Sequence, residues 1–188
     1  AIAYSVNGQQ RDLNDVVSYD AEISIFTIDS DEGLEIMRHT IAAQVLARAI
    51  KNLYPNAKLA IGPTIENGFY YDFLSDERVS EDDLPKIEKE MQKIVAEKSN
   101  IIKTIHTKKE AIKNFDDIKE DYKVKIIEES DQEDNFQLYN QGNTGFIDLC
   151  RGPHLPSLEK VGAFKLTKIA GAYWKGDSKN EMLSRIYG

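Results

Sequence analysis

The sequence predicts an α+β protein in which long helices pack on a largely antiparallel sheet. Two observations lead to this fold class: many short strand-like segments are separated by turn signals, and only three segments repeat apolar residues at helical spacing. A length of 188 residues supports one main domain. A hydrophobic content of 41% and a charged content of 30% are typical of a folded globular chain and exclude a disordered one.

The first thirty residues predict a small β segment. Asn7-Gly8 is a strong signal for a tight turn between two strands, and residues 23–28 alternate with the period of a half-buried strand. A segment of about thirty residues is too short to bury a core of its own. We therefore divide the chain into residues 1–30, a partial β module, and residues 31–188, the main domain.

The first helix is predicted to start after Ser30 and to end before Pro55. Ser30 can cap this helix, and the acidic Asp31 and Glu32 suit the positive end of its dipole. Its expected buried stripe consists of Leu34, Met37, Ile41, Val45, Ala49 and Leu53. Gly33 weakens the first turn.

Two shorter helices and seven further strands complete the prediction. One helix begins at Ser80 with an acidic first turn, and another begins at Thr107, which forms a capping-box pattern with Glu110. The strand-like segments are residues 58–61, 68–73, 101–106, 123–127, 136–139, 145–149 and 164–169. The acidic run at 128–134 is predicted to be a surface loop.

Charge and composition narrow the classes of function. The net charge of −8 argues at first sight against a nucleic-acid partner. However, residues 1–134 carry a balance of −11, whereas residues 135–188 carry +3, so a local basic surface could meet an RNA end. Ordinary solvated lysines explain the same numbers. No apolar run is long enough to span a bilayer, and the single Cys150 excludes an internal disulfide and favours a reducing compartment.

Three histidines and one cysteine are the candidates for chemistry. His39 lies inside the first predicted helix, and His154 follows Cys150 by four residues in the segment DLCRGPH. Taken alone, a buried thiol, a loop histidine and a histidine satisfied in the core explain these residues as well as a site does. His106 has no companion and is expected to be structural. The sequence contains no glycine-rich phosphate loop and no serine nucleophile motif.

Several motifs, taken together, resemble one family. They are His39 on its helix, IGPTIENGFYYDF at 61–73, YKVKI at 122–126, DLCRGPH at 148–154 and AGAYWKGD at 170–177. They resemble the N-terminal editing domain of bacterial threonyl-tRNA synthetases, and residues 1–30 resemble the second half of the TGS module that precedes it. DLCRGPH together with AGAYWKGD is the most specific part of the resemblance.

The resemblance implies a fold shared with the editing domain of alanyl-tRNA synthetase and hydrolysis of serine wrongly esterified to threonine tRNA. Editing is needed because a binding pocket discriminates against one missing methyl group by only ~10–200-fold. The implied catalytic residues are His39, Cys150 and His154, with Asp148 and Lys123 as partners that position water or substrate. The residues expected to contact the substrate are Ala43, Tyr70 and Arg151.

The implied partners are the 3′ end of threonine tRNA carrying serine, and the catalytic and anticodon-binding domains of the same synthetase, which lie outside this sequence. The resemblance also implies a cytoplasmic protein without a membrane partner. We expect that this chain cannot itself charge tRNA, because it contains no motif of an ATP-binding or amino-acid-activating core.

The chain departs from the family at Ala43. The family's helix carries H-x-x-x-H, whereas residues 39–43 read HTIAA, so a methyl group replaces the second imidazole. A rearranged site in which water fills the space, a natural variant with weakened editing, and an engineered loss of activity are the three interpretations. Zinc could be held only by His39, Cys150 and His154, an open three-ligand site. Because the threonyl family edits without metal, we expect no zinc and no other cofactor.

Two rival functions remain open. The first is a catalytically silent module that only binds the tRNA 3′ end, an interpretation that the missing imidazole at Ala43 favours. The second is a hydrolase in which Cys150 is the nucleophile and His154 its partner.

Overall fold

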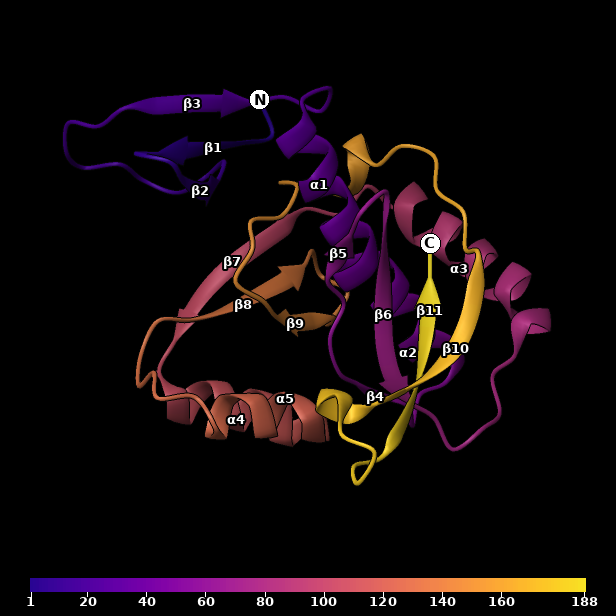
Figure 1. Ribbon diagram of the computed structural model, residues 1–188. Helices are drawn as coiled ribbons and strands as arrows, with labels where there is room; N and C mark the ends of the chain where they lie inside the picture. The colour runs from indigo at the N-terminus through magenta and orange to yellow at the C-terminus, as the bar shows by residue number, and fades with distance from the viewer.

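A computed structural model of residues 1–188 confirms the predicted class, α+β with antiparallel sheets (Figure 1). The strands form three sheets rather than one, and a helical segment runs through the middle of the molecule between two of them. None of the helices has the length and apolar character needed to cross a membrane.

The N-terminal sheet consists of β1 (Ala3–Val6), β2 (Gln9–Asp12) and β3 (Ile23–Phe26) in the order β2-β1-β3. The predicted tight turn is confirmed, since Asn7 and Gly8 both have the positive φ angles that such hairpins require. Phe26 is buried, whereas Ile23 and Ile25 are exposed. Two of the apolar residues of the predicted strand 23–28 therefore face solvent, whereas Phe26 and Ile28 pack toward the main domain.

The central helical segment consists of α1 (Asp31–Thr40), a π-helical turn η1 (Ile41–Leu46) and α2 (Ala47–Leu53). The predicted cap is confirmed, because the Ser30 hydroxyl accepts a hydrogen bond from the Gly33 N–H at 3.0 Å. Glycine is required at position 33, since a Cβ there would lie 1.8 Å from the Thr27 carbonyl oxygen. The close approach of the Thr27 and Gly33 backbones explains why glycine, a residue that weakens helices, occupies the first turn.

The π turn changes which residues of this segment face the core. All six of its residues are buried. A π turn contains one more residue than an α turn, so it shifts the phase of the buried face. Ile36 and Thr40 are buried in α1, whereas Leu34, which we expected in the buried stripe, is 40% exposed. Ile41, Val45 and Ala49 of the predicted stripe are buried, and Met37 and Leu53 pack against the core, so the prediction is wrong only at Leu34.

The largest sheet contains β4 (Lys58–Leu59), β5 (Thr64–Ile65), β6 (Gly68–Leu74), β10 (Lys168–Tyr173) and β11 (Met182–Tyr187). Its order is β10-β11-β6-β4, and β5 pairs with β6. The strand expected at 164–169 begins only at Lys168, and β11 had no predicted counterpart. The buried residues of β11, Leu183 and Ile186, are three positions apart and lack the alternation that marks a half-buried strand.

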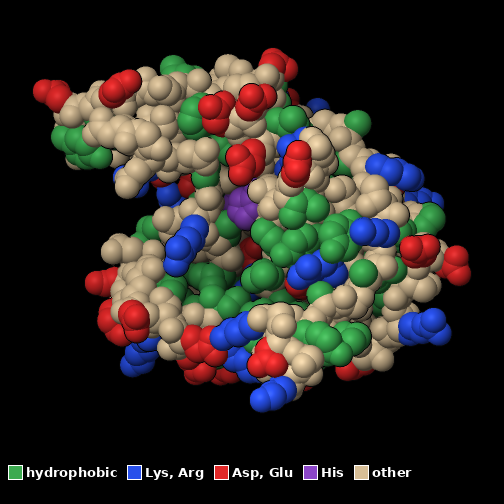
Figure 2. Space-filling view, in the orientation of Figure 1, with side chains coloured by type: hydrophobic (Ala, Val, Ile, Leu, Met, Phe, Trp, Pro, Cys, Tyr) green, Lys and Arg blue, Asp and Glu red, His purple; other side chains and the backbone are tan.

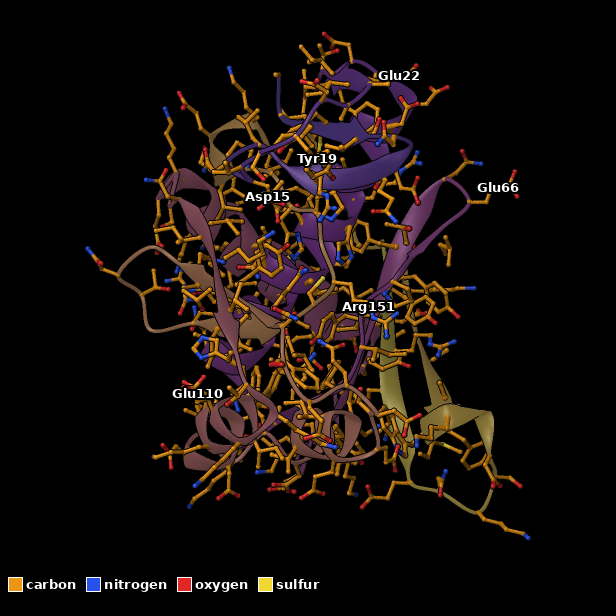
Figure 3. All side chains as sticks on the ribbon, turned by 90° about the vertical axis from the view of Figure 1, so that its left-hand side faces the viewer. Asp15, Tyr19, Glu22, Glu66, Glu110 and Arg151 are labelled. Atoms are coloured by element: carbon orange, nitrogen blue, oxygen red, sulfur yellow. The ribbon has the colours of Figure 1, made fainter.

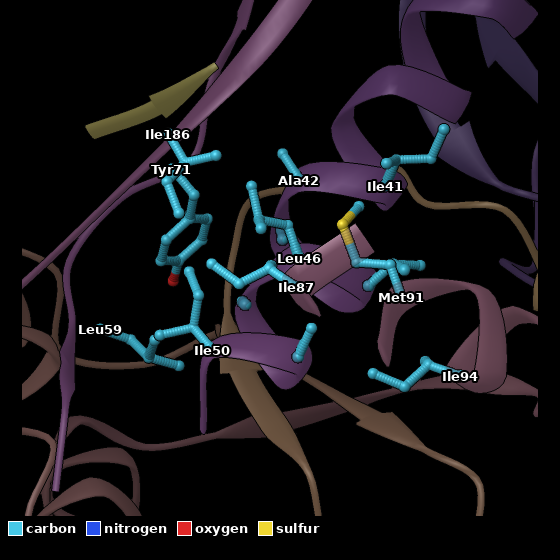
Figure 4. Packing of buried hydrophobic residues seen from close by; sticks show 14 of the residues in the cluster. Ile41, Ala42, Leu46, Ile50, Leu59, Tyr71, Ile87, Met91, Ile94 and Ile186 are labelled. Carbon is cyan, nitrogen blue, oxygen red and sulfur yellow. The ribbon is translucent and has the colours of Figure 1, made fainter. Parts of the chain in front are cut away.

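Behind this sheet lie the short 3-10 helix η2 (Glu81–Asp83) and α3 (Leu84–Ala96), which together correspond to the helix predicted from Ser80. The main core lies where the central segment, β6 and α3 meet (Figure 4). Its large members include Leu46, Ile50, Tyr71, Ile87 and Met91, all fully buried. Packing on both sides therefore holds the central segment in place.

The third sheet consists of β7 (Ile101–His106), β8 (Phe136–Gln141) and β9 (Ile147–Leu149), in that order. It is accompanied by α4 (Lys108–Asp117) and α5 (Asp121–Glu128), and short 3-10 turns follow at η3 (Leu158–Lys160) and η4 (Trp174–Gly176). The capping box of Thr107 and Glu110 is confirmed.

The strand predicted at 123–127 was wrong, because this segment lies within helix α5. The alternation of lysine with apolar residues indicated a strand, but one of the two lysines is itself buried. Tyr122, Lys123 and Ile127 are the buried residues of α5, and Ile127 packs with Phe115 of α4. The helix thereby directs a lysine into the interior.

Candidate functional site

A cavity of about 860 Å³ lies between the central helical segment, α5, β9 and the segment at 61–63. Figure 2 shows a hollow below the N-terminal sheet with a histidine in its wall, and Figure 3 shows Arg151 near the middle of the face turned toward the viewer. Six residues predicted for the site line this cavity: His39, Ala43, Lys123, Asp148, Cys150 and Arg151.

His39 and Cys150 form a direct contact in the wall of the cavity. The distance from His39 Nε2 to Cys150 Sγ is 2.7 Å, and the sulfur also accepts the Gly152 N–H at 3.1 Å. Burial raises the pKa of the Cys150 thiol to about 12 and lowers the pKa of His39. Both groups are therefore neutral near pH 7, and the S–H donates to the imidazole.

His154 does not line the cavity and instead lies behind His39. The two rings are stacked, with centroids 4.6 Å apart and planes 7° from parallel. Thr40 Oγ1 lies 3.0 Å from His154 Nδ1 and accepts the Leu155 N–H. If the Thr40 hydroxyl donates its proton to Nδ1, the imidazole proton is on Nε2, an assignment made from the hydrogen-bond network.

The environment of His154 keeps it uncharged. Burial is the main cause that holds the pKa of His154 well below its ordinary value, and the adjacent His39 lowers it further. Its Nε2 is buried and has no hydrogen-bond partner. A buried polar group without a partner is costly, so this atom is the least satisfied part of the site.

Lys123 and Asp148 form a buried ion pair on the floor of the cavity. The Lys123 ammonium lies 2.8 Å from Asp148 Oδ1, and the two side chains are 4% and 2% exposed. The same oxygen accepts the Leu149 N–H at 2.9 Å, whereas Asp148 Oδ2 accepts no hydrogen bond within the chain. Burial raises the pKa of Asp148, and Lys123 opposes that rise. One carboxylate oxygen thus remains available to a ligand.

The three residues expected to contact the substrate lie in different surroundings. Ala43 lines the same cavity as His39, and Arg151 lines its exposed rim. Tyr70 does not line this cavity: its ring lies on β6, 3.9 Å from the Arg185 guanidinium. Its role in substrate binding stays a prediction that the position of its ring does not favour.

His39, Cys150 and His154 could also hold a metal ion, because one ligand atom of each lies within 4.8 Å of the others. A cysteine with two histidines is a donor set that suits zinc. In the structure, however, His39 and Cys150 bond to each other, and His154 Nδ1 bonds to Thr40. Zinc binding would also require the Cys150 thiol to lose its proton. The expected absence of a metal stays a prediction.

Sequence reasoning missed the residues that support His154 from behind. The Tyr139 ring meets the His154 ring edge-on, with centroids 4.6 Å apart, and the Tyr139 hydroxyl donates to Asp12 Oδ2 at 2.6 Å. Gly152 has a φ of 62°, and a Cβ there would lie 2.0 Å from the Tyr139 hydroxyl oxygen. Thr40 could have been found from the sequence, because it is adjacent to His39. Asp12 could not, because it lies more than a hundred residues from both Tyr139 and His154.

Residues 137–187 match the family described as the threonyl and alanyl tRNA synthetase second additional domain. The match extends over most of β8 and the whole of β9, β10 and β11, and it includes Asp148, Cys150 and His154. In this part of the chain, the protein is therefore similar to a domain of aminoacyl-tRNA synthetases.

Whole-chain similarity points to one kind of synthetase. The chain is 49% identical to a threonine–tRNA ligase of Wolbachia pipientis subsp. Culex pipiens (strain wPip), 48% identical to one of Ehrlichia canis (strain Jake) and 50% identical to one of Ruthia magnifica subsp. Calyptogena magnifica. Each comparison covers all of this chain and 29% of the relative, so the chain spans less than a third of these proteins. The resemblance predicted from the motifs is confirmed: along its whole length this chain is similar to part of the threonine–tRNA ligases.

Proposed function

We propose that this chain is an editing domain that hydrolyses the ester of serine mischarged onto threonine tRNA. The observation that carries the proposal is one cavity whose wall holds neutral His39 and Cys150 beside the buried Lys123–Asp148 pair. The similarity to threonine–tRNA ligases supports the choice of tRNA. Ester hydrolysis needs groups that orient water and groups that stabilise a developing oxyanion, and this cavity offers both kinds.

In the proposed reaction, a water oxygen bonds to the ester carbonyl carbon and the bond from that carbon to the ribose oxygen breaks. A proton from the water passes to the ribose oxygen, so that serine and uncharged tRNA leave. The Lys123 ammonium suits the oxyanion, and the free Asp148 Oδ2 suits the ammonium group of serine. Near His39, the space beside the Ala43 methyl has room for the attacking water.

The direct test is deacylation of serine-charged threonine tRNA by the purified chain. We expect release of serine well above the buffer background and little release of threonine from correctly charged tRNA. A folded chain that releases serine no faster than buffer would contradict the proposal. Equal release of both amino acids would support an esterase but contradict a sieve that excludes threonine.

The proposed reaction uses no metal, and elemental analysis tests this separately. We expect protein purified without chelators to contain less than about 0.1 zinc per chain and to keep its activity in excess chelator. Stoichiometric zinc, with activity lost on chelation and restored by zinc, would instead assign a metal to His39, Cys150 and His154.

A silent module that only binds the tRNA 3′ end is the second candidate, and the observation that favours it is the methyl group of Ala43 in the cavity wall. It predicts equal binding of charged and uncharged tRNA without hydrolysis. Under this alternative, an Ala43→His variant would also be inactive, so the same deacylation assay separates the two functions.

A mechanism with Cys150 as nucleophile is disfavoured by the chemistry of the site. A nucleophilic thiol needs a lowered pKa and a basic partner, whereas burial raises the pKa of Cys150 to about 12 and lowers the pKa of His39. Full activity in a Cys150→Ala variant would exclude this mechanism.

A further inference from the structure

Asp12 connects the N-terminal sheet to the back of the site. It is the last residue of β2, and its side chain is only 14% exposed. Its Oδ1 accepts the backbone N–H of His154 at 2.9 Å, and its Oδ2 accepts the Tyr139 hydroxyl at 2.6 Å. One carboxylate therefore bonds to two residues of the main domain that lie more than 120 positions away in the sequence.

These contacts continue to the cavity through packed rings. Tyr139 lies edge-on against His154, and His154 stacks on His39, which in turn contacts Cys150. His154 has two hydrogen-bonded atoms, its backbone N–H on Asp12 and its Nδ1 on Thr40. Without the Asp12 bond, only the hydrogen bond with Thr40 and the contacts with the neighbouring rings would hold the His154 imidazole in position.

The charge of Asp12 is balanced within the same contact. The Lys103 ammonium of β7 lies 3.0 Å from Asp12 Oδ2 and 2.6 Å from Asp15 Oδ1. The Asp15 carboxylate bonds to neither Tyr139 nor His154, and its Oδ2 accepts the backbone N–H of Asp12 at 3.2 Å. Figure 3 shows Asp15 just below the N-terminal sheet, above the face on which Arg151 lies. Two aspartates thus share one lysine, and only one of them reaches the site.

We propose that Asp12 is a positioning residue for editing, which holds His154 and, through it, the His39 ring at the cavity wall. The inference rests on the proposed function. Under this proposal, the N-terminal sheet contributes to the geometry of the site through Asp12. Because Asp12 does not line the cavity, its loss should lower kcat and leave KM for the mischarged tRNA unchanged within twofold.

The experiment compares Asp12→Ala and Asp12→Asn with the control Asp15→Asn in the full chain. The control removes a carboxylate charge from the same lysine but keeps an acceptor oxygen for the Asp12 backbone N–H. We expect kcat for serine release to fall about tenfold in Asp12→Ala, since small displacements of reacting groups carry large rate costs. Asp12→Asn, which keeps one acceptor oxygen, should fall less, and Asp15→Asn should stay within twofold.

A second measurement does not depend on activity. Amide hydrogen exchange followed by NMR should be at least tenfold faster at His154 in Asp12→Ala and unchanged there in Asp15→Asn. The Ile87 amide, in α3 on the far side of the core, should exchange at one rate in all the proteins and so report global stability. If Asp12→Ala does not fold, the same two measurements on Asp12→Asn and Asp15→Asn decide between the outcomes.

The outcomes separate the two proposals. An unmodified chain without editing activity contradicts the proposed function and the positioning role with it, whatever the exchange rates show. An active chain in which Asp12→Ala and Asp15→Asn behave alike, in kcat and in His154 exchange, overturns the positioning role alone. Faster exchange at Ile87 together with His154 would assign Asp12 to general stability and also overturn it.

Discussion

His39, Cys150 and His154 are largely removed from water, and each therefore keeps its neutral form near pH 7. Burial is the largest cause in all three cases, and it acts against the charged form of each group. Asp148 differs because the Lys123 ammonium, 2.8 Å away, opposes the rise in pKa that burial causes. At the scale of single residues, the site thus combines neutral hydrogen-bonding groups with one buried ion pair.

Acid should destabilise the fold through His154. Its folded pKa lies well below the unfolded value of about 6.5, so between these values the unfolded chain binds more protons. Stability is fully present above about pH 6.5 and is lost as the pH falls toward the folded pKa, by at most about 1.4 kcal/mol per pH unit. Urea unfolding at pH 7.5, 6.5 and 5.5 measures this loss.

A His154→Gln variant is the control for that titration. Asp148, whose raised pKa acts in the opposite direction, is present in both proteins, so the difference between their slopes reports His154. We expect a flatter dependence on pH in the variant. Parallel curves would show that His154 does not carry the effect.

Ala43→His should raise the rate of serine release, because it places an imidazole one turn from His39 on the wall of the same cavity. Steady-state deacylation measures the change. Ala43→Gln, which fills the same space without an imidazole, is the matched control. A rate that is unchanged or lower in Ala43→His would mean that the site works in a rearranged form in which Ala43 is sufficient.

At the scale of elements, α1, η1 and α2 determine how the site is presented. The π turn frees backbone groups, and one of them is satisfied from another element: the Gln141 side-chain amide donates to the Gln44 carbonyl at 3.0 Å. Arg48 in turn donates to Gln141 Oε1 at 2.8 Å. π turns often occur at functional sites, and this one begins two residues after His39 and contains Ala43.

Helix α5 contributes the lysine of the ion pair, and removal of its charge should be costly. Lys123→Met leaves Asp148 buried without a partner, so we expect a loss of about 3 kcal/mol in the free energy of unfolding. The double variant Lys123→Met with Asp148→Asn should recover much of this stability, because no unpaired charge remains. Urea unfolding measures both.

Activity should not follow stability in these variants. If Lys123 stabilises the oxyanion, serine release falls at least tenfold in Lys123→Met and stays low in the double variant. Recovery of activity along with stability would contradict a direct role for Lys123 and leave it a structural residue.

The elements that were predicted correctly have strong local signals. The Asn7-Gly8 turn, the Ser30 cap and the Thr107–Glu110 capping box are each determined by neighbouring residues, and all three are confirmed. Helix α5 was predicted as a strand because Lys123, which belongs to its buried face, was counted as an exposed polar residue. Local patterns assume that charged residues face solvent, and functional sites break that assumption.

At the scale of the whole molecule, the net charge of −8 limits affinity for RNA. The excess of acidic residues lies in residues 1–134, whereas residues 135–188 carry a balance of +3. Arg151, one of these basic residues, lies at the rim of the cavity. Only a small part of the surface is therefore suited to receive a tRNA end. Strong attachment would need further contacts than this surface offers.

We expect weak binding of an RNA with a single-stranded 3′ end, with a slope of log K against log salt between 0 and about −2. Fluorescence anisotropy at several salt concentrations measures it. Arg151→Ala should weaken binding, whereas Lys89→Ala, on the exposed face of α3, should leave it unchanged. A slope near −6, or equal effects of both variants, would indicate a broad RNA surface instead.

The sequence by itself determined the fold class and the motifs that resemble threonyl-tRNA synthetases, because both depend on residue type and local spacing. The choice of His39, Lys123, Asp148 and Cys150 followed from that resemblance, position by position. Only the tertiary structure decided that these four line one cavity, that His154 lies behind it, and that Tyr70 lies elsewhere. The same holds for Asp12, which reaches His154 from the N-terminal sheet. Contacts between distant segments depend on how elements pack, and no periodicity along the chain records that packing.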